Sequence, residues 1–266
     1  MELTAYDRVK TARSTKRPTG LEYIHGIFTD FIEFHGDRRY KDDAAIVGGV
    51  ALLEGRPVTV IAMEKGHTTK ERAARSFGAP HPEGYRKALR LMKQAEKFHR
   101  PVVCFIDTSG AHCGIGAEER GQGQAIAENL LEMMTLNTPI ISILTGEGGS
   151  GGALALAVAD QVWMLENAVY SVISPEGCAS ILWKDAAKAG LAATNLKLTA
   201  RDALTASVIE RMISEEDLGL PDFYGQIRTQ LTQELQQLIA DDRLLQHRYE
   251  RFRRLGTPVS AEDQRL

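Results

Sequence analysis

The sequence predicts an α/β fold. The main observation is a unit that occurs twice, in which a run of apolar and β-branched residues is followed by a glycine-rich turn and then by a stretch with helical spacing. The first unit covers residues 101–137 and the second covers residues 138–159. Predicted strand pairs lie before and after these units, and 43% of the 266 residues are hydrophobic, which is enough for a large core.

Composition argues against several classes of protein. The net charge of −3 gives no reason to expect specific nucleic-acid binding, and no run approaches the roughly 18 apolar residues of a membrane span. The N-terminus lacks the apolar core of a signal peptide. The three cysteines have no CxxC spacing and indicate neither a disulfide framework nor a zinc site, so no metal is expected. We therefore expect a soluble cytoplasmic protein.

The first quarter of the chain is expected to contain helices and one strand pair. Residues 1–20 are basic and polar and should form a short helix followed by an irregular segment. Apolar side chains at helical spacing predict an amphipathic helix over residues 21–33. The runs 46–53 and 57–63 are joined by three residues that include a glycine, which is typical of a β-hairpin.

Residues 64–82 show no strong period and should form a long loop with at most one helical turn. Their basic side chains are Lys65, Lys70, Arg72 and Arg75. Two interpretations stay open, a solvated charged face or a wall that meets phosphates or an acidic partner. A helix should then run from Pro82 to about His99, because proline is favoured at the first helical position and apolar residues follow at helical spacing.

The two strand–turn–helix units come next. The strand 101–107 leads into a turn at 107–114 and a helix over 116–137. In the second unit, a strand from Thr138 gives way to five glycines within residues 146–152 and then to an apolar helix. The first N–H groups of a helix have no intrahelical partner, and glycines place no side chain in front of them. This turn can therefore bind a negatively charged oxygen.

The last third is expected to be mostly helical. Short strands are predicted over 161–166 and 168–172, and Ser174 should cap a helix that begins at Pro175. Residues 196–214 contain helix-forming stretches. A long amphipathic helix over 223–245 packs either on its own domain or on a partner, and we favour the partner.

The glycines also match two other motifs. Gly146–Gly151 reads GxGxxG, and Glu166 lies twenty residues after Gly146, so an NAD-type dinucleotide-binding protein is an alternative. G-x-S-x-G around Ser150 is the nucleophile motif of serine hydrolases, but His247 is the one histidine downstream and lies in a charged helix. A P-loop is excluded because no Lys-Ser or Lys-Thr follows the glycines.

A third interpretation uses both glycine turns. If the two turns face one cavity, the peptide N–H groups near residues 151 and 152 can donate to an oxygen that becomes negatively charged during a reaction. No side-chain base is then required if the substrate supplies its own. Because proline is tolerated in the first turn of a helix, Gly152→Pro should remove one donor and keep the fold.

Several long motifs resemble one family. Over about residues 20–215, the chain is similar to the carboxyltransferase α subunit of bacterial acetyl-CoA carboxylase in the segments IVGGVALLEGRPV, PEGYRKALRLM, DTSGAHCGIGAEERGQ, TGEGGSGGALALAVAD and YSVISPEGCASILWK. The resemblance implies a crotonase-like spiral of ββα units over residues 21–215. It leaves a basic N-terminal segment at 1–20 and a helical C-terminal extension at 216–266.

The resemblance also implies a reaction and partners. A β subunit, in an α2β2 complex, would join this chain to transfer a carboxyl group from biotin to acetyl-CoA, which gives malonyl-CoA in the first committed step of fatty acid biosynthesis. The biotin would be attached to a biotin carboxyl carrier protein rather than to this chain, and biotin carboxylase would belong to the wider complex. Any zinc site would lie in the β subunit.

The resemblance assigns roles to residues of the turns. The amides of Gly151 and Gly152 would be catalytic and hold the ureido oxygen of biotin, while the matching turn of the β subunit would hold the thioester enolate and a biotin nitrogen would take the acetyl proton. Substrate-binding positions would be Gly110, Ala111, Gly114, Gly148, Gly149 and Ser150.

The first turn departs from the family pattern, which often reads DTPGAYPG. This chain has Ser109, His112 and Cys113 in place of Pro, Tyr and Pro. Adjacent side chains rarely point at each other, so we expect His112 and Cys113 to line a pocket rather than to form a catalytic pair.

Overall fold

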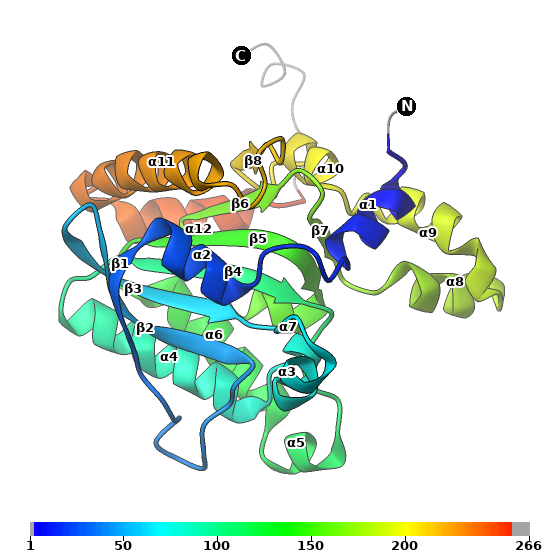
Figure 1. Cartoon of the computed structure of the whole chain (residues 1–266), viewed down its shortest axis with the longest axis horizontal. Coiled ribbons are helices and arrows are strands. Elements are labelled where there is room, and N and C mark those ends of the chain that lie inside the picture. Colours follow the sequence, from blue (N-terminus) through cyan, green and yellow to red (C-terminus); the bar gives the residue numbers. More distant parts are fainter. Residues whose placement is uncertain (1–2, 257–266) are drawn as a thin grey trace.

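One mixed sheet runs through the molecule. In the part of the chain that the computed structural model describes, residues 3–256, eight strands form this sheet in the order β1-β2-β3-β4-β5-β6-β8, and β7 pairs with β5 (Figure 1). The strands are β1 (Thr29–Glu33), β2 (Ile46–Leu53), β3 (Arg56–Met63), β4 (Val102–Thr108), β5 (Ile140–Gly149), β6 (Gln161–Leu165), β7 (Val169–Ser171) and β8 (Arg211–Ile213). The pairings of β1 with β2 and of β2 with β3 are antiparallel, and the others are parallel. The predicted α/β class is confirmed.

Helices cover both faces of the sheet. They are α1 (Ala5–Ala12), α2 (Gly20–Ile27), α3 (Thr69–Ala74), α4 (Pro82–Lys97), α5 (Ile115–Glu119), α6 (Gln122–Thr135), α7 (Ser150–Leu154), α8 (Pro175–Trp183), α9 (Ala189–Leu196), α10 (Ala200–Thr205), α11 (Pro221–Ala240) and α12 (Leu244–Arg254). Helix α4 packs on β2 and β3 with α6 beside it, whereas α2 packs on β3 and β4 with α11 against it (Figure 1). Within residues 3–256, no helix is both long and apolar enough to cross a membrane.

The predicted hairpin and the two central strands are confirmed. In the turn between β2 and β3, Glu54 and Gly55 have φ angles of 48° and 78°, the left-handed pair typical of a two-residue hairpin. Residues 102–106 of β4 and 140–144 of β5 are fully buried, because helices cover both faces of the sheet at this point. The expected cap of α8 is also present, since the Ser174 hydroxyl accepts a hydrogen bond from the Gly177 N–H.

The helix predicted over residues 21–33 is only half helical. Helix α2 ends at Ile27, and the residues after it form β1, which pairs with β2. A bulge between Thr29 and Ile32 breaks the register of this pairing, and Asp30 there has a φ of 53°. The apolar spacing of residues 28–33 is compatible with a helix, but these residues form a strand because they pair with β2.

Two helical predictions around the glycines are wrong in extent. The helix expected over 116–137 is divided into α5 and α6 at Gly121, whose φ of 83° suits glycine. Strand β5 continues through most of the glycines, and α7 has only five residues. Gly148 pairs with Thr108 of β4 on one side and Tyr170 of β7 on the other, so strand pairing holds the segment that was expected to be a turn.

The C-terminal helices pack on the chain's own core. In α11, the side chains of Phe223, Ile227, Leu231 and Leu235 are at most 2% exposed. Our expectation that this helix packs on a partner is therefore wrong for its apolar face. The stretch 196–214, expected to be helical, also contains β8.

Arg248 of α12 lies completely buried and ties the tail to the sheet. Its guanidinium forms an ion pair with Asp160 at 2.7 Å. It also donates to the carbonyl oxygens of Met133, Leu136 and Thr138. These carbonyls lie at the end of α6 and the start of β5, so one side chain holds three elements together.

Candidate active site

Two glycine-containing turns meet at the carboxyl edge of the sheet. We call residues 149–152 the donor turn and residues 109–112 the facing turn; they follow the parallel neighbours β5 and β4. A Cβ atom at Gly152 would lie 2.5 Å from the Ala111 amide nitrogen, and one at Gly149 would collide with the Ser109 carbonyl. The backbones of the two turns are therefore in contact, and only glycine fits at these two positions. The expected convergence of the turns is confirmed.

The donor turn presents backbone N–H groups without side chains in front of them. Helix α7 begins at Ser150, so the N–H groups of Ser150, Gly151 and Gly152 belong to its first turn and have no intrahelical acceptor. An added Cβ at Gly151 would have Ile126 as its nearest neighbour, at 3.6 Å, so the space around this residue is open. Because α7 has only five residues, its dipole is small, and the N–H groups themselves must supply the attraction for an anion.

Tyr85 of α4 holds the donor turn by a hydrogen bond to its backbone. Its hydroxyl donates a hydrogen bond to the carbonyl oxygen of Gly152 at 3.2 Å. The side chain is fully buried, and burial raises the pKa of Tyr85 well above its ordinary value, so the phenol stays neutral. A buried neutral donor holds the turn without adding charge to it.

A cavity of about 120 Å³ opens beside the donor turn. Its lining residues are Val9, Arg13, Ser109, Glu147, Gly148, Gly149, Ser150, Val169, Ser171, Val172, Ile173, Ser174, Pro175 and Leu198. Val9 and Arg13 come from the basic N-terminal segment. The segment therefore forms part of the candidate site.

Paired charges lie under the donor turn. The N–H of Glu147 donates to Oδ1 of Asp107 at 2.8 Å, which ties the end of β5 to the end of β4. The ammonium group of Lys65 lies 2.6 Å from Asp107 and 3.6 Å from Glu147, and Nε of Arg13 lies 2.7 Å from Glu147. Both carboxylates are thus paired with cations of this chain.

Most predicted site residues come together. Gly110 and Ala111 of the facing turn contact the donor turn, and Gly148 precedes it in β5. Gly114 is the exception, because it caps α5 and faces the His112 ring. The side chains that the sequence did not point to are Tyr85, Arg13, Glu147 and Asp107. Lys65, one of the basic residues of the 64–82 segment, pairs with two of these carboxylates. Asp107 and Glu147 could have been found, since each lies at the end of a predicted strand.

The three residues that depart from the family pattern have separate environments. Ser109 lines the cavity. His112 stacks on His81 with ring centroids 4.0 Å apart. Cys113 is exposed, whereas Cys104 is buried in β4 and Cys178 is partly exposed in α8. Among the described residues, no group of three or more His, Cys, Asp or Glu side chains could hold a metal ion.

The dinucleotide alternative does not fit this geometry. The fingerprint needs a glycine turn that opens a full helix at the pyrophosphate, whereas Gly146, Gly148 and Gly149 lie in β5 and α7 has five residues. Glu166 lies 3.7 Å from the guanidinium of Arg8, so its carboxylate is paired rather than free to bind a ribose.

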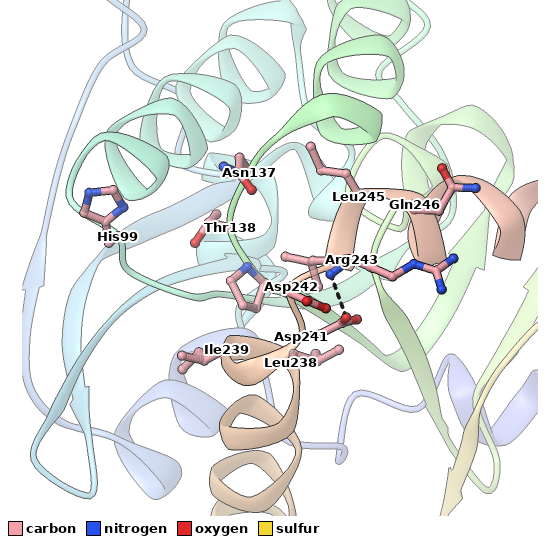
Figure 2. Close-up of a pocket in the computed structure, with 12 residues that line it drawn as sticks. His99, Asn137, Thr138, Leu238, Ile239, Asp241, Asp242, Arg243, Leu245 and Gln246 are labelled. Atoms are coloured by element: carbon pink, nitrogen blue, oxygen red, sulfur yellow. Dashed lines mark hydrogen bonds between the residues drawn. The ribbon is translucent and has the colours of Figure 1, made fainter.

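The serine hydrolase interpretation fails on distance. Ser150 has a φ of 51°, a sharp conformation like that of a nucleophile elbow. However, His247 pairs with Asp241. Asp241 lines a cavity together with Thr138, which lies at the opposite end of β5 (Figure 2). The ten residues of β5 span roughly 30 Å, so this histidine cannot reach the Ser150 hydroxyl.

Ser150→Ala should therefore keep most of the activity of the assembled enzyme. The physical reason is that the residue contributes its backbone to the donor turn, which alanine retains. Activity assays and labelling with a fluorophosphonate probe would check this. Stoichiometric labelling of the wild-type chain at Ser150 would contradict it and favour a hydrolase.

A second cavity, of about 560 Å³, lies away from both turns. It is lined by loops at the amino ends of β4 and β5 and by the junction of α11 with α12, including Asn137, Asp242 and Arg243 (Figure 2). Ligands of parallel sheets bind at the carboxyl ends of the strands. The candidate site is therefore at the donor turn, where Ser150 lines both the cavity of about 120 Å³ and a further cavity of about 290 Å³ that Gly151 also lines.

Comparison with known proteins identifies the family of the chain. The family described as acetyl co-enzyme A carboxylase carboxyltransferase-like matches residues 1–256. The chain is 62% identical to the acetyl-coenzyme A carboxylase carboxyl transferase subunit alpha of Ruminiclostridium cellulolyticum, over 96% of this chain and 98% of that one. It is 55% identical to the protein of the same name in Clostridium acetobutylicum, over 98% of both chains. It also matches 45% of a Clostridium tetani protein named subunits beta/alpha, with 55% identity over 96% of this chain.

Solved structures agree on the fold. A transcarboxylase 12S subunit superposes with a TM-score of 0.68 and 19% identity, over 85% of this chain and 44% of that one. A chain of a Pseudomonas malonate decarboxylase hetero-tetramer gives a TM-score of 0.66 and 20% identity, over 85% of this chain and 89% of that one. Sequence, family match and fold lead to one conclusion: the chain belongs to the acetyl-CoA carboxylase carboxyltransferase family, with the crotonase-like α/β fold of these enzymes and high similarity to their alpha subunits.

Proposed function

We propose that this chain, together with a β subunit, transfers a carboxyl group from biotin to acetyl-CoA and so makes malonyl-CoA for fatty acid biosynthesis. The observation that carries the proposal is the donor turn, whose open N–H groups lie against the facing turn in a chain so similar to named alpha subunits. Gly151 and Gly152 are the proposed catalytic residues, and Gly110, Ala111, Gly114, Gly148, Gly149 and Ser150 are the proposed substrate-binding residues.

The donor turn fits the ureido group of biotin. When bound, biotin supplies the carboxyl group that is transferred. A carbonyl oxygen needs two converging donors and no side chain in the way, and the open space around Gly151 meets the second requirement. The N–H groups of Gly151 and Gly152 would donate to that oxygen and stabilise the negative charge that develops on it. Tyr85 holds the turn in place, so little reorganisation is needed during the reaction.

Within residues 3–256, the carboxylates next to the donor turn are paired with cations. Asp107 and Glu147, the nearest carboxylates in the network, are paired with Lys65 and Arg13. The proton that leaves the acetyl group must therefore be accepted by a group that the substrates or the partner provide. This supports a reaction in which the chain contributes positioning and hydrogen bonds rather than proton transfer.

The proposed partner is the β subunit in an α2β2 complex. Carboxyl transfer produces negative charge on two oxygens, one on each substrate, and this chain has one donor turn. Relatives named subunits beta/alpha, in which both are one chain, support the partnership. The other proposed partners are the protein that carries biotin and the enzyme biotin carboxylase. The proposed location is the cytoplasm, and the three unpaired cysteines agree with a reducing compartment.

The isolated chain should show no carboxyl transfer and should gain it when the β subunit is added. Exchange between malonyl-CoA and biocytin measures the reaction directly. Turnover by the purified chain alone would contradict the proposal. Binding of the β subunit without any exchange would instead indicate a scaffold without catalytic function.

A further inference from the structure

The N-terminal helix reaches the candidate site with a charged side chain, Arg13. Arg13, the C-cap of α1, donates from Nε to Glu147 at 2.7 Å and from Nη1 to Glu176 at 2.7 Å, with Nη2 3.3 Å from the second oxygen of Glu176. Glu147 lies in β5 two residues before the donor turn, and Glu176 lies in the first turn of α8. The guanidinium thus connects α1, β5 and α8 beside the cavity that Arg13 and Glu147 line.

Packing holds α1 in the position that this contact requires. Val9 and Ala12 are buried against Val169, Ala193 and Leu198, so the helix rests on β7 and α9. Arg8, one turn earlier, donates to the carbonyl oxygen of Glu166 and is separate from the cavity. The position of α1 therefore does not depend on Arg13 alone.

Arg13 reduces an excess of negative charge beside the cavity. Three carboxylates, Asp107, Glu147 and Glu176, face two cations, Lys65 and Arg13. The hydrogen bond from Arg13 lowers the pKa of Glu176. Burial alone would lower the pKa of Arg13, but its hydrogen bonds to Glu176 and Glu147 raise it. Each partner thus favours the charged form of the other.

We propose that Arg13 is a positioning residue for carboxyl transfer, which orients Glu147 beside the donor turn and cancels negative charge next to the oxygen that the turn stabilises. This inference rests on the proposed function. Without the guanidinium, the Glu147 carboxylate would repel the developing negative charge on that oxygen. Arginine suits the role because its planar fork addresses two carboxylates at once, whereas lysine provides a single point charge.

The test uses the complex with the β subunit and the malonyl-CoA–biocytin exchange assay. Arg13→Ala should lower kcat by about tenfold, the order expected for one uncompensated charge near the reacting oxygen, with KM for malonyl-CoA within about twofold. Arg8→Ala is the matched control, since it removes the same side chain from the same helix; kcat should stay within about twofold. Arg13→Lys keeps the charge but loses the two-carboxylate contact, so its kcat should fall between those of the wild type and Arg13→Ala.

A charge rescue separates this role from a structural one. Adding Glu147→Gln to Arg13→Ala removes the unbalanced carboxylate and should recover most of the lost kcat. The inference is overturned if Arg13→Ala behaves like Arg8→Ala, if Arg13→Lys falls as low as Arg13→Ala, or if Glu147→Gln restores nothing. An inactive wild-type complex would instead contradict the proposed function itself, so the two failures are distinguishable.

Discussion

In the assembled complex, Gly151→Pro is expected to lower carboxyl transfer by about 100- to 1,000-fold, the cost of one missing oxyanion donor. Proline has no N–H, and its ring fits the first turn of a helix, where the amide has no intrahelical partner. Gly151→Ala is the matched control, because it keeps the N–H and its Cβ would make only an ordinary contact with Ile126. Exchange between malonyl-CoA and biocytin would measure both variants.

The proline substitution is better made at Gly151 than at Gly152. The sequence suggested that proline would be tolerated there, but any Cβ at Gly152 would collide with the backbone of the facing turn. A loss of activity in that variant could therefore reflect a distorted turn. For Gly151→Pro, thermal unfolding and binding of the β subunit must stay close to those of Gly151→Ala, because proline also restricts Ser150 before it. Turnover equal to that of the alanine variant would rule out the Gly151 N–H as a donor.

Arg248→Ala is expected to destabilise the fold by about 3–5 kcal/mol, the range for breaking a buried ion pair. The change leaves the Asp160 carboxylate, with a side chain only 4% exposed, without its cation. It also removes the donor from carbonyl oxygens at the end of α6 and the start of β5. Equilibrium unfolding in urea, followed by circular dichroism, would measure the loss.

Arg253→Ala is a suitable control for this effect. Arg253 lies on the same helix and is exposed, so its removal should change the free energy of unfolding by less than about 0.5 kcal/mol. If Arg248→Ala lost no more than the control, α12 would not be an integral part of the fold. A truncation after α11 should then also leave the unfolding transition unchanged.

The central part of the fold could be predicted because its signals are local. The β2–β3 hairpin has two apolar runs around a glycine turn, and β4 and β5 are short apolar runs followed by glycines. Each of these patterns lies within about ten residues of sequence. The resemblance to a family added the crotonase-like arrangement, which periodicity alone does not distinguish from other α/β folds.

The missed features depend on contacts between distant segments. β1 and β8 are short edge strands whose form is decided by the strand beside them, and local spacing favoured helix at both. Arg13 and Glu147 are 134 residues apart in sequence, and Arg248 and Asp160 are 88 apart. No local pattern links such pairs. The donor turn could be predicted because its glycines lie close together in the sequence. Supporting side chains such as Arg13 and Tyr85 were missed because they lie far from the turn in the sequence.

The unequal exposure of the three cysteines provides a route to observing assembly directly. Burial raises the pKa of the Cys104 thiol to about 12, so it stays protonated and unreactive, whereas Cys113 is open to solvent beside the facing turn. With Cys178→Ser, a maleimide dye would attach to Cys113 alone. Its fluorescence would then follow the approach of the β subunit in real time, with no cysteine added to the chain.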